Sequence, residues 1–164
     1  GRMCGICGVV AADPRLIEDS VGRMMRVMHH RGPDDGGFQL LPLGLAASGP
    51  FVGFGFRRLS ILDLSPTGHQ PMANPETGDW LVFNGEIYNF RELRAQLLAT
   101  GAVFRSSGDT EVLLQALSTW REAALEKIHG MYALAFYHSA TRRVLLARDP
   151  LGIKPLYVGR TNEA

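Results

Sequence analysis

The pattern of hydrophobic and polar positions separates the chain into strands and helices. A short apolar run rich in β-branched residues, at 5–10, indicates a buried strand near the start. Apolar residues then recur every three or four positions over 17–29, which predicts a helix. The same periodicity predicts helices over 90–100 and 109–120, and Asp109 is the expected N-cap of the second.

Other runs are wholly apolar or alternate between apolar and polar residues, and they predict strands. These runs lie at 38–41, 45–47, 52–59, 80–83, 86–88, 131–137 and 142–147. Asn84-Gly85 falls between two of them, and Asn-Gly between strands is the strongest short signal of a hairpin turn. Glycines and prolines predict irregular loops at 30–37 and 65–75. Strands grouped with strands and helices with helices favour an α+β fold of antiparallel sheets covered by helices.

Composition fits one ordinary globular domain. The chain has 164 residues, of which 46% are hydrophobic and 20% charged, and its formal net charge is +1. This charge indicates no nucleic-acid or membrane surface, and the apolar runs are too short to span a bilayer. Two cysteines make no secreted disulfide framework and no signal peptide is visible, so a cytoplasmic location is expected. Gly1-Arg2 look like a tag remnant ahead of the initiator, Met3.

The candidate chemistry begins at Cys4, which directly follows Met3. Removal of the initiator would leave a thiol nucleophile beside a free α-amine, which titrates near ~7.7–8.0 and can accept the thiol proton. On position alone, a free cysteine near a strand is more often a small buried hydrophobe than a nucleophile. Cys4 and Cys7 also form a C-x-x-C pair, which can be a redox motif or half of a zinc site. The chain has no second cysteine pair, so no metal site is predicted.

Six segments carry a resemblance to a known family. They are Met3-Cys4-Gly5-Ile6, His30-Arg31-Gly32-Pro33-Asp34, Arg58-Leu59-Ser60-Ile61, Asn84-Gly85-Glu86-Ile87-Tyr88-Asn89, Ser107-Gly108-Asp109-Thr110-Glu111 and Arg148-Asp149-Pro150-Leu151-Gly152-Ile153-Lys154-Pro155-Leu156-Tyr157. In this order they resemble the N-terminal glutaminase domain of class II glutamine amidotransferases, most closely that of asparagine synthetases. Pro33 favours the asparagine-synthetase branch, because related purine-pathway enzymes carry Gln there.

The resemblance implies an N-terminal-nucleophile hydrolase fold, a four-layer αββα sandwich of two antiparallel sheets between helices. It also implies the reaction, in which L-glutamine is hydrolysed to glutamate and ammonia through a thioester on Cys4. Residues 1–3 are then a tag remnant and the initiator methionine. The resemblance further implies that residues 4–164 form one glutamine amidotransferase type 2 domain.

Members of the family usually continue into a C-terminal ATP-dependent synthetase domain, which receives the ammonia. The Ser-Gly-Gly-x-Asp-Ser signature of that domain is absent here, so the resemblance implies a domain excised from a longer protein. ATP and Mg²⁺ are expected only in the missing domain, and this domain is expected to need no cofactor. Asparagine synthesis is the expected role, the full-length protein could form a homodimer, and neither nucleic acid nor a membrane is an expected partner.

The family pattern also assigns the residues around the Cys4 nucleophile. The Asn84 side chain and the Gly85 backbone N–H match the oxyanion hole. Arg58 matches the bidentate clamp for the α-carboxylate of glutamine, and Glu86 and Asp109 match the partners of its α-ammonium group. Backbone groups of the stretch after Arg58 would line the pocket: Leu59, Ser60, Ile61 and Leu62.

Two alternatives remain. A domain of the same fold could be a catalytically silent scaffold that only docks a synthetase domain, as in β-lactam-forming relatives that lose the nucleophile. A thiol redox protein built on Cys4 and Cys7 would need a helix after Cys4, and the apolar strand disfavours it.

Overall fold

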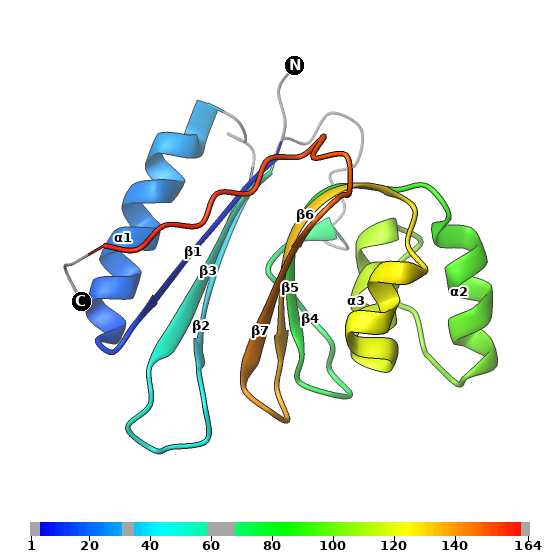
Figure 1. Cartoon of the computed structure of the whole chain (residues 1–164), viewed down its shortest axis with the longest axis horizontal. Helices are drawn as coiled ribbons and strands as arrows, with labels where there is room; N and C mark the ends of the chain where they lie inside the picture. Colours follow the sequence, from blue (N-terminus) through cyan, green and yellow to red (C-terminus); the bar gives the residue numbers. More distant parts are fainter. Residues whose placement is uncertain (1–3, 31–34, 59–67, 162–164) are drawn as a thin grey trace.

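Two antiparallel β-sheets lie face to face between helices in the computed structural model, which describes residues 4–30, 35–58 and 68–161 (Figure 1). The strands are β1 (Gly5–Ala11), β2 (Asp35–Pro42), β3 (Phe51–Arg58), β4 (Met72–Ala73), β5 (Trp80–Ile87), β6 (Gly130–His138) and β7 (Arg143–Arg148). The helices are α1 (Pro14–Val27), α2 (Phe90–Ala99) and α3 (Asp109–Trp120), with 3₁₀ turns at Met28–His30 and Arg121–Glu126. Sheet A has the order β1-β3-β2, and sheet B has the order β4-β5-β6-β7.

Apolar clusters fill the three spaces between the layers. Helix α1 covers the outer face of sheet A, and α2 with α3 cover the outer face of sheet B (Figure 1). The third cluster lies between the inner faces of the two sheets. The alternation of side chains along each strand supplies one face to each cluster. The predicted α+β class and the αββα layering are therefore confirmed.

Helix α1 approaches sheet A closely because two residues of β3 have no side chain. A Cβ atom on Gly53 would lie 2.3 Å from Ile17 Cγ2. A Cβ atom on Gly55 would lie 2.7 Å from both Val21 Cγ1 and Cys7 Sγ. Ile17 and Val21 are fully buried in this contact. The missing side chains at Gly53 and Gly55 thus let Ile17 and Val21 pack directly on the strand, within the apolar cluster that joins the two layers.

Three local predictions are wrong. β2 begins at Asp35, so the glycines at 36 and 37 belong to a paired strand instead of a loop. Asn84-Gly85 form no hairpin turn, because they lie inside β5, which pairs with β6 along its whole length. Residues 45–47 form bends and a turn instead of a strand. In the first two cases pairing with a distant strand overrides the local preference of glycine for turns.

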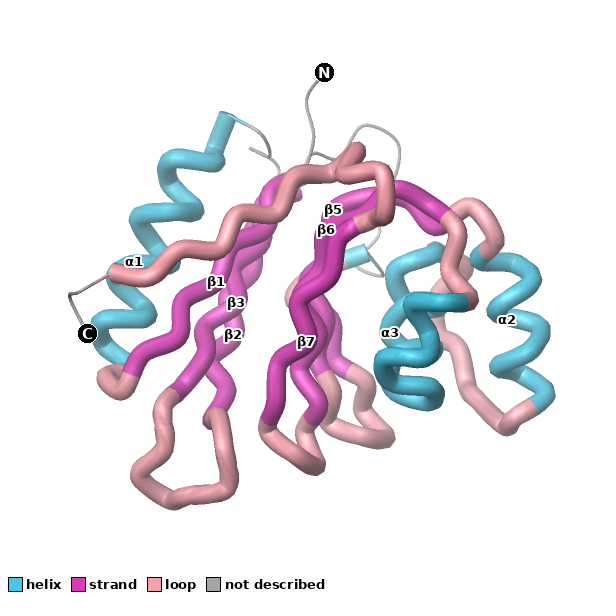
Figure 2. Tube along the Cα trace, viewed as in Figure 1, coloured by secondary structure: helices cyan, strands magenta, loops and turns pink. Residues whose placement is uncertain are grey.

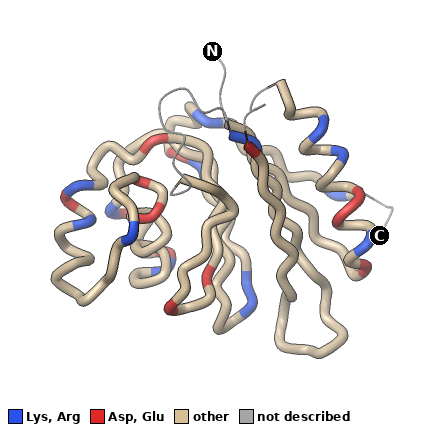
Figure 3. Tube along the Cα trace, turned by 180° about the vertical axis from the view of Figure 1, so that it is seen from behind, with Lys and Arg blue, Asp and Glu red and all other residues tan. Residues whose placement is uncertain are grey.

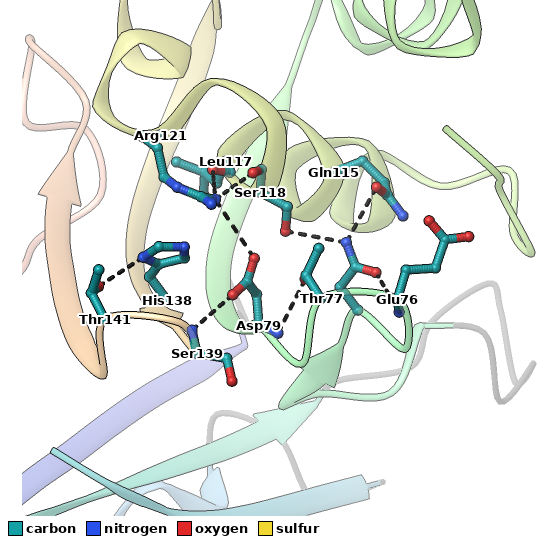
Figure 4. A network of polar contacts seen from close by, with 11 residues as sticks. Glu76, Thr77, Asp79, Gln115, Leu117, Ser118, Arg121, His138, Ser139 and Thr141 are labelled. Atoms are coloured by element: carbon teal, nitrogen blue, oxygen red, sulfur yellow. Dashed lines mark hydrogen bonds and ion pairs between the residues drawn. The ribbon is translucent and has the colours of Figure 1, made fainter. Parts of the chain in front are cut away.

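A buried polar network holds the end of sheet B at which β5 begins (Figure 4). Asp79 accepts a hydrogen bond from Ser139 N–H at 2.8 Å, and its other oxygen lies 3.7 Å from Arg121 Nη1. Asn74 donates to Ser118 Oγ of α3 at 3.2 Å. The network therefore joins the β4–β5 connection, the β6–β7 turn and the C-terminal end of α3.

The surface carries both signs of charge. Figure 3 shows lysine and arginine interspersed with aspartate and glutamate over the helices and turns, while the strands carry fewer charges. After β7 the chain continues as an extended loop towards the α1 side (Figure 2). No helix in the described part of the chain is both long and apolar enough to span a membrane.

Candidate active site

One side of the candidate site is a row of three residues across sheet A. The register of β1 and β3 pairs Gly5 with Arg57, so the next step along this antiparallel pair sets Cys4 opposite Arg58. On the other side of β3, Arg58 pairs with Asp35 of β2. Directly opposite residues of antiparallel strands share a face and lie about 5 Å apart. Cys4 packs with the cluster between the sheets, so this row faces sheet B.

The side chains of Cys4 and Cys7 lie on opposite faces of sheet A. Cys4 packs between the sheets, whereas Cys7 packs against α1. Burial raises the pKa of the Cys7 thiol to about 11, even though a backbone hydrogen bond from Gly55 lowers it in part. Cys7 is therefore a protonated, structural thiol at neutral pH. The redox and zinc interpretations of the C-x-x-C pair are wrong, because residues three apart in a strand point to opposite faces.

The two adjacent arginines at the end of β3 also divide between the faces. Arg57 Nε donates a hydrogen bond to the Met25 carbonyl of α1 at 3.3 Å, which holds Arg57 on the outer face. Arg58 comes next on the inner face, in the row with Cys4. Of these two arginines, it is therefore Arg58 that is set to meet a ligand beside the Cys4 thiol.

The facing sheet contributes Asn84 and Gly85 from the interior of β5. Val82 packs in the cluster between the sheets, so alternation along the strand directs Asn84 towards sheet A as well. Asn84 is 8% exposed. Gly85 has a φ of +152°, and a Cβ atom there would lie 2.0 Å from the Met131 carbonyl oxygen of β6. Only glycine fits this backbone and this close contact.

Asp109 joins α3 to the end of β5. It is the first residue of α3 rather than the predicted N-cap, and its Oδ2 accepts a hydrogen bond from Ile87 N–H at 2.9 Å. Burial raises the pKa of Asp109 and the charge of Glu86 raises it further, although the N–H groups of Ile87, Asp109 and Thr110 partly offset the rise. The two predicted ammonium partners, Glu86 and Asp109, therefore lie within electrostatic reach of each other.

The structure assembles these residues from the two facing sheets. Strands β1 and β3 both contact β5, and Cys4 shares the cluster between the sheets with Val82. Sheet A supplies Cys4 and Arg58, while β5 and the start of α3 supply the remaining described residues. Four predicted pocket residues lie outside the described ranges, and their role stays a prediction: Leu59, Ser60, Ile61 and Leu62.

Sequence reasoning missed a polar pair beside Arg58. His69 Nδ1 lies 2.8 Å from Asp35 Oδ2, and the two residues are 34 positions apart, so no local pattern could indicate the pair. Burial alone would raise the pKa of Asp35, but hydrogen bonds from His69 and Gly36 N–H and the charge of Arg58 outweigh burial and lower it. Asp35 is therefore an anion at neutral pH in direct strand register with Arg58.

Asp149 was a second omission, although its segment helped to carry the resemblance. Its side chain is buried and accepts hydrogen bonds from the N–H groups of Tyr132, Ile153 and Lys154 at 3.2, 2.8 and 2.9 Å. Burial on its own would raise the pKa of Asp149, but these donors and Arg148 hold it below its usual value. Asp149 therefore fastens the turn after β7 to β6.

A pocket of about 290 Å³ lies between β4 and α3, and Met72, Trp80, Glu111 and Leu114 are among its lining residues. The Glu111 carboxylate accepts hydrogen bonds from the N–H and hydroxyl of Ser106. None of the predicted site residues that the structure describes lines this pocket. Over residues 4–30, 35–58 and 68–161, no group of three or more His, Cys, Asp or Glu side chains is placed to hold a metal ion.

Comparison with known proteins identifies the family of the chain. The sequence matches the glutamine amidotransferase domain family over residues 3–164. It is 40% identical over 165 residues to asparagine synthetase [glutamine-hydrolyzing] 1 of Bacillus subtilis, covering 98% of this chain and 25% of that protein. It is 42% identical over 168 residues to a putative asparagine synthetase [glutamine-hydrolyzing] of Mycobacterium bovis, covering 95% of this chain and 25% of that protein.

Among solved structures, the chain resembles the glutamine phosphoribosylpyrophosphate amidotransferase of B. subtilis, with a TM-score of 0.66 and 22% identity over 98% of this chain and 40% of that one. This likeness shows a shared fold, in agreement with the two antiparallel sheets between helices described above. The chain spans about a quarter of the length of the asparagine synthetases that it matches. Because the family model matches nearly the whole length of the chain, the chain belongs to the glutamine amidotransferase domain family.

Proposed function

We propose that this domain hydrolyses L-glutamine to glutamate and ammonia with Cys4 as the nucleophile. The observation that carries the proposal is the row of Cys4 and Arg58 on sheet A, which faces Asn84 and Gly85 on sheet B. A thiol, a guanidinium and amide donors are the groups needed to hold an amino acid and attack its side-chain amide. The relatives at 40% and 42% identity are named glutamine-hydrolyzing, which supports the same substrate.

The reaction on this proposal has two steps. Cys4 Sγ attacks the side-chain amide carbon of glutamine while the free α-amine of Cys4 takes up the thiol proton. Asn84 Nδ2 and Gly85 N–H stabilise the oxyanion that forms. The C–N bond then breaks, the nitrogen leaves with that proton as ammonia, and a thioester remains. Water attacks the thioester carbon, the C–S bond breaks, the thiol regains a proton and glutamate leaves.

Recognition of the amino-acid end uses charged residues from both sheets and from the start of α3. The planar guanidinium of Arg58 binds the α-carboxylate through two parallel hydrogen bonds. Asp109 and Glu86 bind the α-ammonium group. The family resemblance adds residues 59–62 to the residues expected to bind glutamine.

The parent protein adds a further part to the proposal. Because the chain spans a quarter of its asparagine synthetase relatives, we place a C-terminal ATP-dependent synthetase domain after it, which receives the ammonia for asparagine synthesis in the cytoplasm. ATP and Mg²⁺ belong to that domain, and hydrolysis of glutamine by Cys4 needs no cofactor.

A glutaminase assay on the chain beginning at Cys4 tests the nucleophile. Cys4→Ala should abolish ammonia release, whereas Cys7→Ser should retain most of it, because Cys7 faces α1 and not the site. Equal loss in both variants would contradict the assignment of Cys4. A folded, mass-verified chain with Cys4 intact that releases no ammonia would instead identify a silent scaffold.

Two further variants separate binding from chemistry in the same assay. Arg58→Lys keeps the charge but loses the planar fork, so the KM for glutamine should rise. Asn84→Ala should lower kcat by about 10²–10³-fold with less effect on KM. Unchanged glutamine kinetics in Arg58→Lys would remove Arg58 from the carboxylate site.

A further inference from the structure

A short segment, residues 68–71, touches both sheets beside the candidate site. Its anchor on sheet B is Gln70, which is 4% exposed. Gln70 Oε1 accepts a hydrogen bond from Phe83 N–H of β5 at 2.6 Å, immediately before Asn84 in the chain. A buried hydrogen bond of this length fixes the segment firmly to the strand that carries Asn84.

The same segment is fitted to sheet A at two points. A Cβ atom on Gly37 of β2 would lie 2.1 Å from the Gln70 carbonyl oxygen, so the segment packs directly on the strand backbone. Two residues earlier in β2, Asp35 Oδ2 lies 2.8 Å from His69 Nδ1. The segment therefore spans the gap between β2 and β5 with a contact at each end.

The segment also meets the side chain of Arg58. A Cβ atom on Gly68 would lie 3.1 Å from Arg58 Nη2 and 3.3 Å from its Cζ. The guanidinium thus rests against the backbone of Gly68, while Asp35, the strand partner of Arg58, is held by His69. Gly68, His69 and Asp35 together limit where the guanidinium can lie.

We propose that the 68–71 segment is a strut that sets the position of Arg58 relative to Asn84, and so sets the affinity of the domain for glutamine. The inference rests on the proposed function, because it takes Arg58 and Asn84 as the residues that hold the two ends of glutamine. Arg58 would hold the α-carboxylate, which does not change during the reaction, so a shift of this contact should weaken binding more than it slows the chemical step. Gly68, His69 and Gln70 act through Arg58 and Asn84 and are positioning residues.

Gly68→Ala tests the strut at its contact with Arg58. The added methyl displaces the end of a flexible side chain and no backbone atom, so the fold should keep its thermal stability. The displacement should weaken glutamine binding by about tenfold while kcat changes by less than about twofold. Gly159→Ala is the matched control, because nothing lies within 4 Å of its added Cβ.

His69 variants test the second contact. His69→Leu removes the hydrogen bond to Asp35 and should raise KM by about two- to threefold, a smaller effect because the pair is partly exposed. His69→Asn sets an amide near the place of Nδ1 and should restore most of the affinity. His138→Leu is the control, since it removes a similar hydrogen bond, to Thr141 at 2.7 Å, in the β6–β7 turn.

The readout is the dissociation constant for glutamine, measured by calorimetry on chains that begin at residue 4 and carry Cys4→Ala, together with KM and kcat in the active background. Weaker binding by Gly68→Ala, with an unchanged melting temperature, supports the strut. Wild-type affinity in both Gly68→Ala and His69→Leu would overturn it, and so would a loss of stability without a change in affinity. Glutamine binding without hydrolysis in the Cys4 chain would overturn the proposed glutaminase function and leave the strut standing.

Discussion

Asn84 and Gly85 lie in the interior of β5, which is paired with β6 along its whole length, whereas Cys4 and Arg58 lie at the ends of β1 and β3. The first pair is fixed by the core, since Gly85 touches the backbone of β6. The second pair lies where the pairing of β1 with β3 ends, at the margin of sheet A. The comparison teaches that the proposed oxyanion side of the site is built into the fold, whereas the proposed nucleophile side lies at a sheet margin, where we expect substitutions to cost less stability.

The helices repeat this difference. On sheet B, α2 and α3 pack through a large cluster of fully buried side chains that includes Leu97, Leu113 and Leu117. On sheet A, α1 packs through a smaller apolar cluster that includes Ile17 and Val21, and its close approach is made possible by Gly53 and Gly55. Because apolar area removed from water scales with side-chain size, sheet B and its helices hold most of the hydrophobic stabilisation.

The largest expected effect lies on the nucleophile side. With Gly1-Arg2-Met3 retained, the nitrogen of Cys4 is part of a peptide bond and cannot act as a base. General-base catalysis typically contributes about 10²–10⁴-fold to the rate. Hydrolysis should therefore fall by about this factor, while the melting temperature stays the same. Removal of residues 1–3 should restore turnover and labelling of the thiol by a glutamine-like diazo-ketone.

The control for this experiment is the intact mass of each preparation, because cleavage during expression would produce the free amine unnoticed. Full turnover in a chain whose mass includes residues 1–3 would show that another group serves as the base. A large change in melting temperature on trimming would contradict the expected separation of the nucleophile side from the core.

Gly85→Ala should break the oxyanion side and the fold together. The new Cβ would lie 2.0 Å from the Met131 carbonyl oxygen, at a φ of +152° that side chains rarely adopt. Strain and overpacking should together lower the free energy of unfolding by about 2–5 kcal/mol, as measured by urea denaturation. Gly108→Ala is the comparison, because its added Cβ meets nothing within 4 Å. Wild-type stability in Gly85→Ala would mean that β5 can shift away from β6.

The sequence could predict elements that depend on local patterns, but not those that depend on pairing between distant segments. Periodicity found α1, α2 and α3, because each buries a continuous apolar stripe that is visible within a dozen residues. Cys4 became a candidate nucleophile because it follows Met3, whereas Arg58 and Asp109 were assigned to the site only by the family resemblance. Residue spacing by itself favoured a hairpin at Asn84-Gly85, and that prediction was wrong because pairing with β6 decides the conformation there.

Residues that act across long separations could not be predicted in this way. His69 and Asp35 are 34 positions apart, and the Gln70 side chain meets the Phe83 backbone 13 positions along the chain. The opposite faces of Cys4 and Cys7 are a consequence of strand alternation, which the apolar run at 5–10 already contained. The alternation of side chains in a strand could therefore have argued, from the sequence alone, against a redox or zinc role for Cys4 and Cys7.

Asp149→Asn should have an intermediate effect, confined to stability. The variant replaces one acceptor oxygen with a donor opposite backbone N–H groups, which should lower the free energy of unfolding by about 2–3 kcal/mol at pH 7. The folded pKa of Asp149 is below its unfolded value, so its stabilisation is present above that unfolded value, near ~3.9, and is lost as pH falls through the folded pKa. The gap between wild type and variant should therefore shrink in acid. The exposed Asp19→Asn on α1 is the charge-matched control, and an equal loss there would remove the special role of Asp149.

The smallest expected effect is a pH dependence of glutamine binding through Asp109. Burial raises the pKa of Asp109 above its usual value of about 3.9, so the carboxylate is protonated at a higher pH than an exposed aspartate. On the proposed assignment the α-ammonium group binds the ionised form, so the dissociation constant in a Cys4→Ala background should rise as the pH falls towards the raised pKa of Asp109. Asp109→Asn should bind weakly at neutral pH and show a flatter profile, since its amide does not titrate. A wild-type profile as flat as that of Asp109→Asn would show that Asp109 does not hold the ammonium group and that its bond to Ile87 N–H is its whole role.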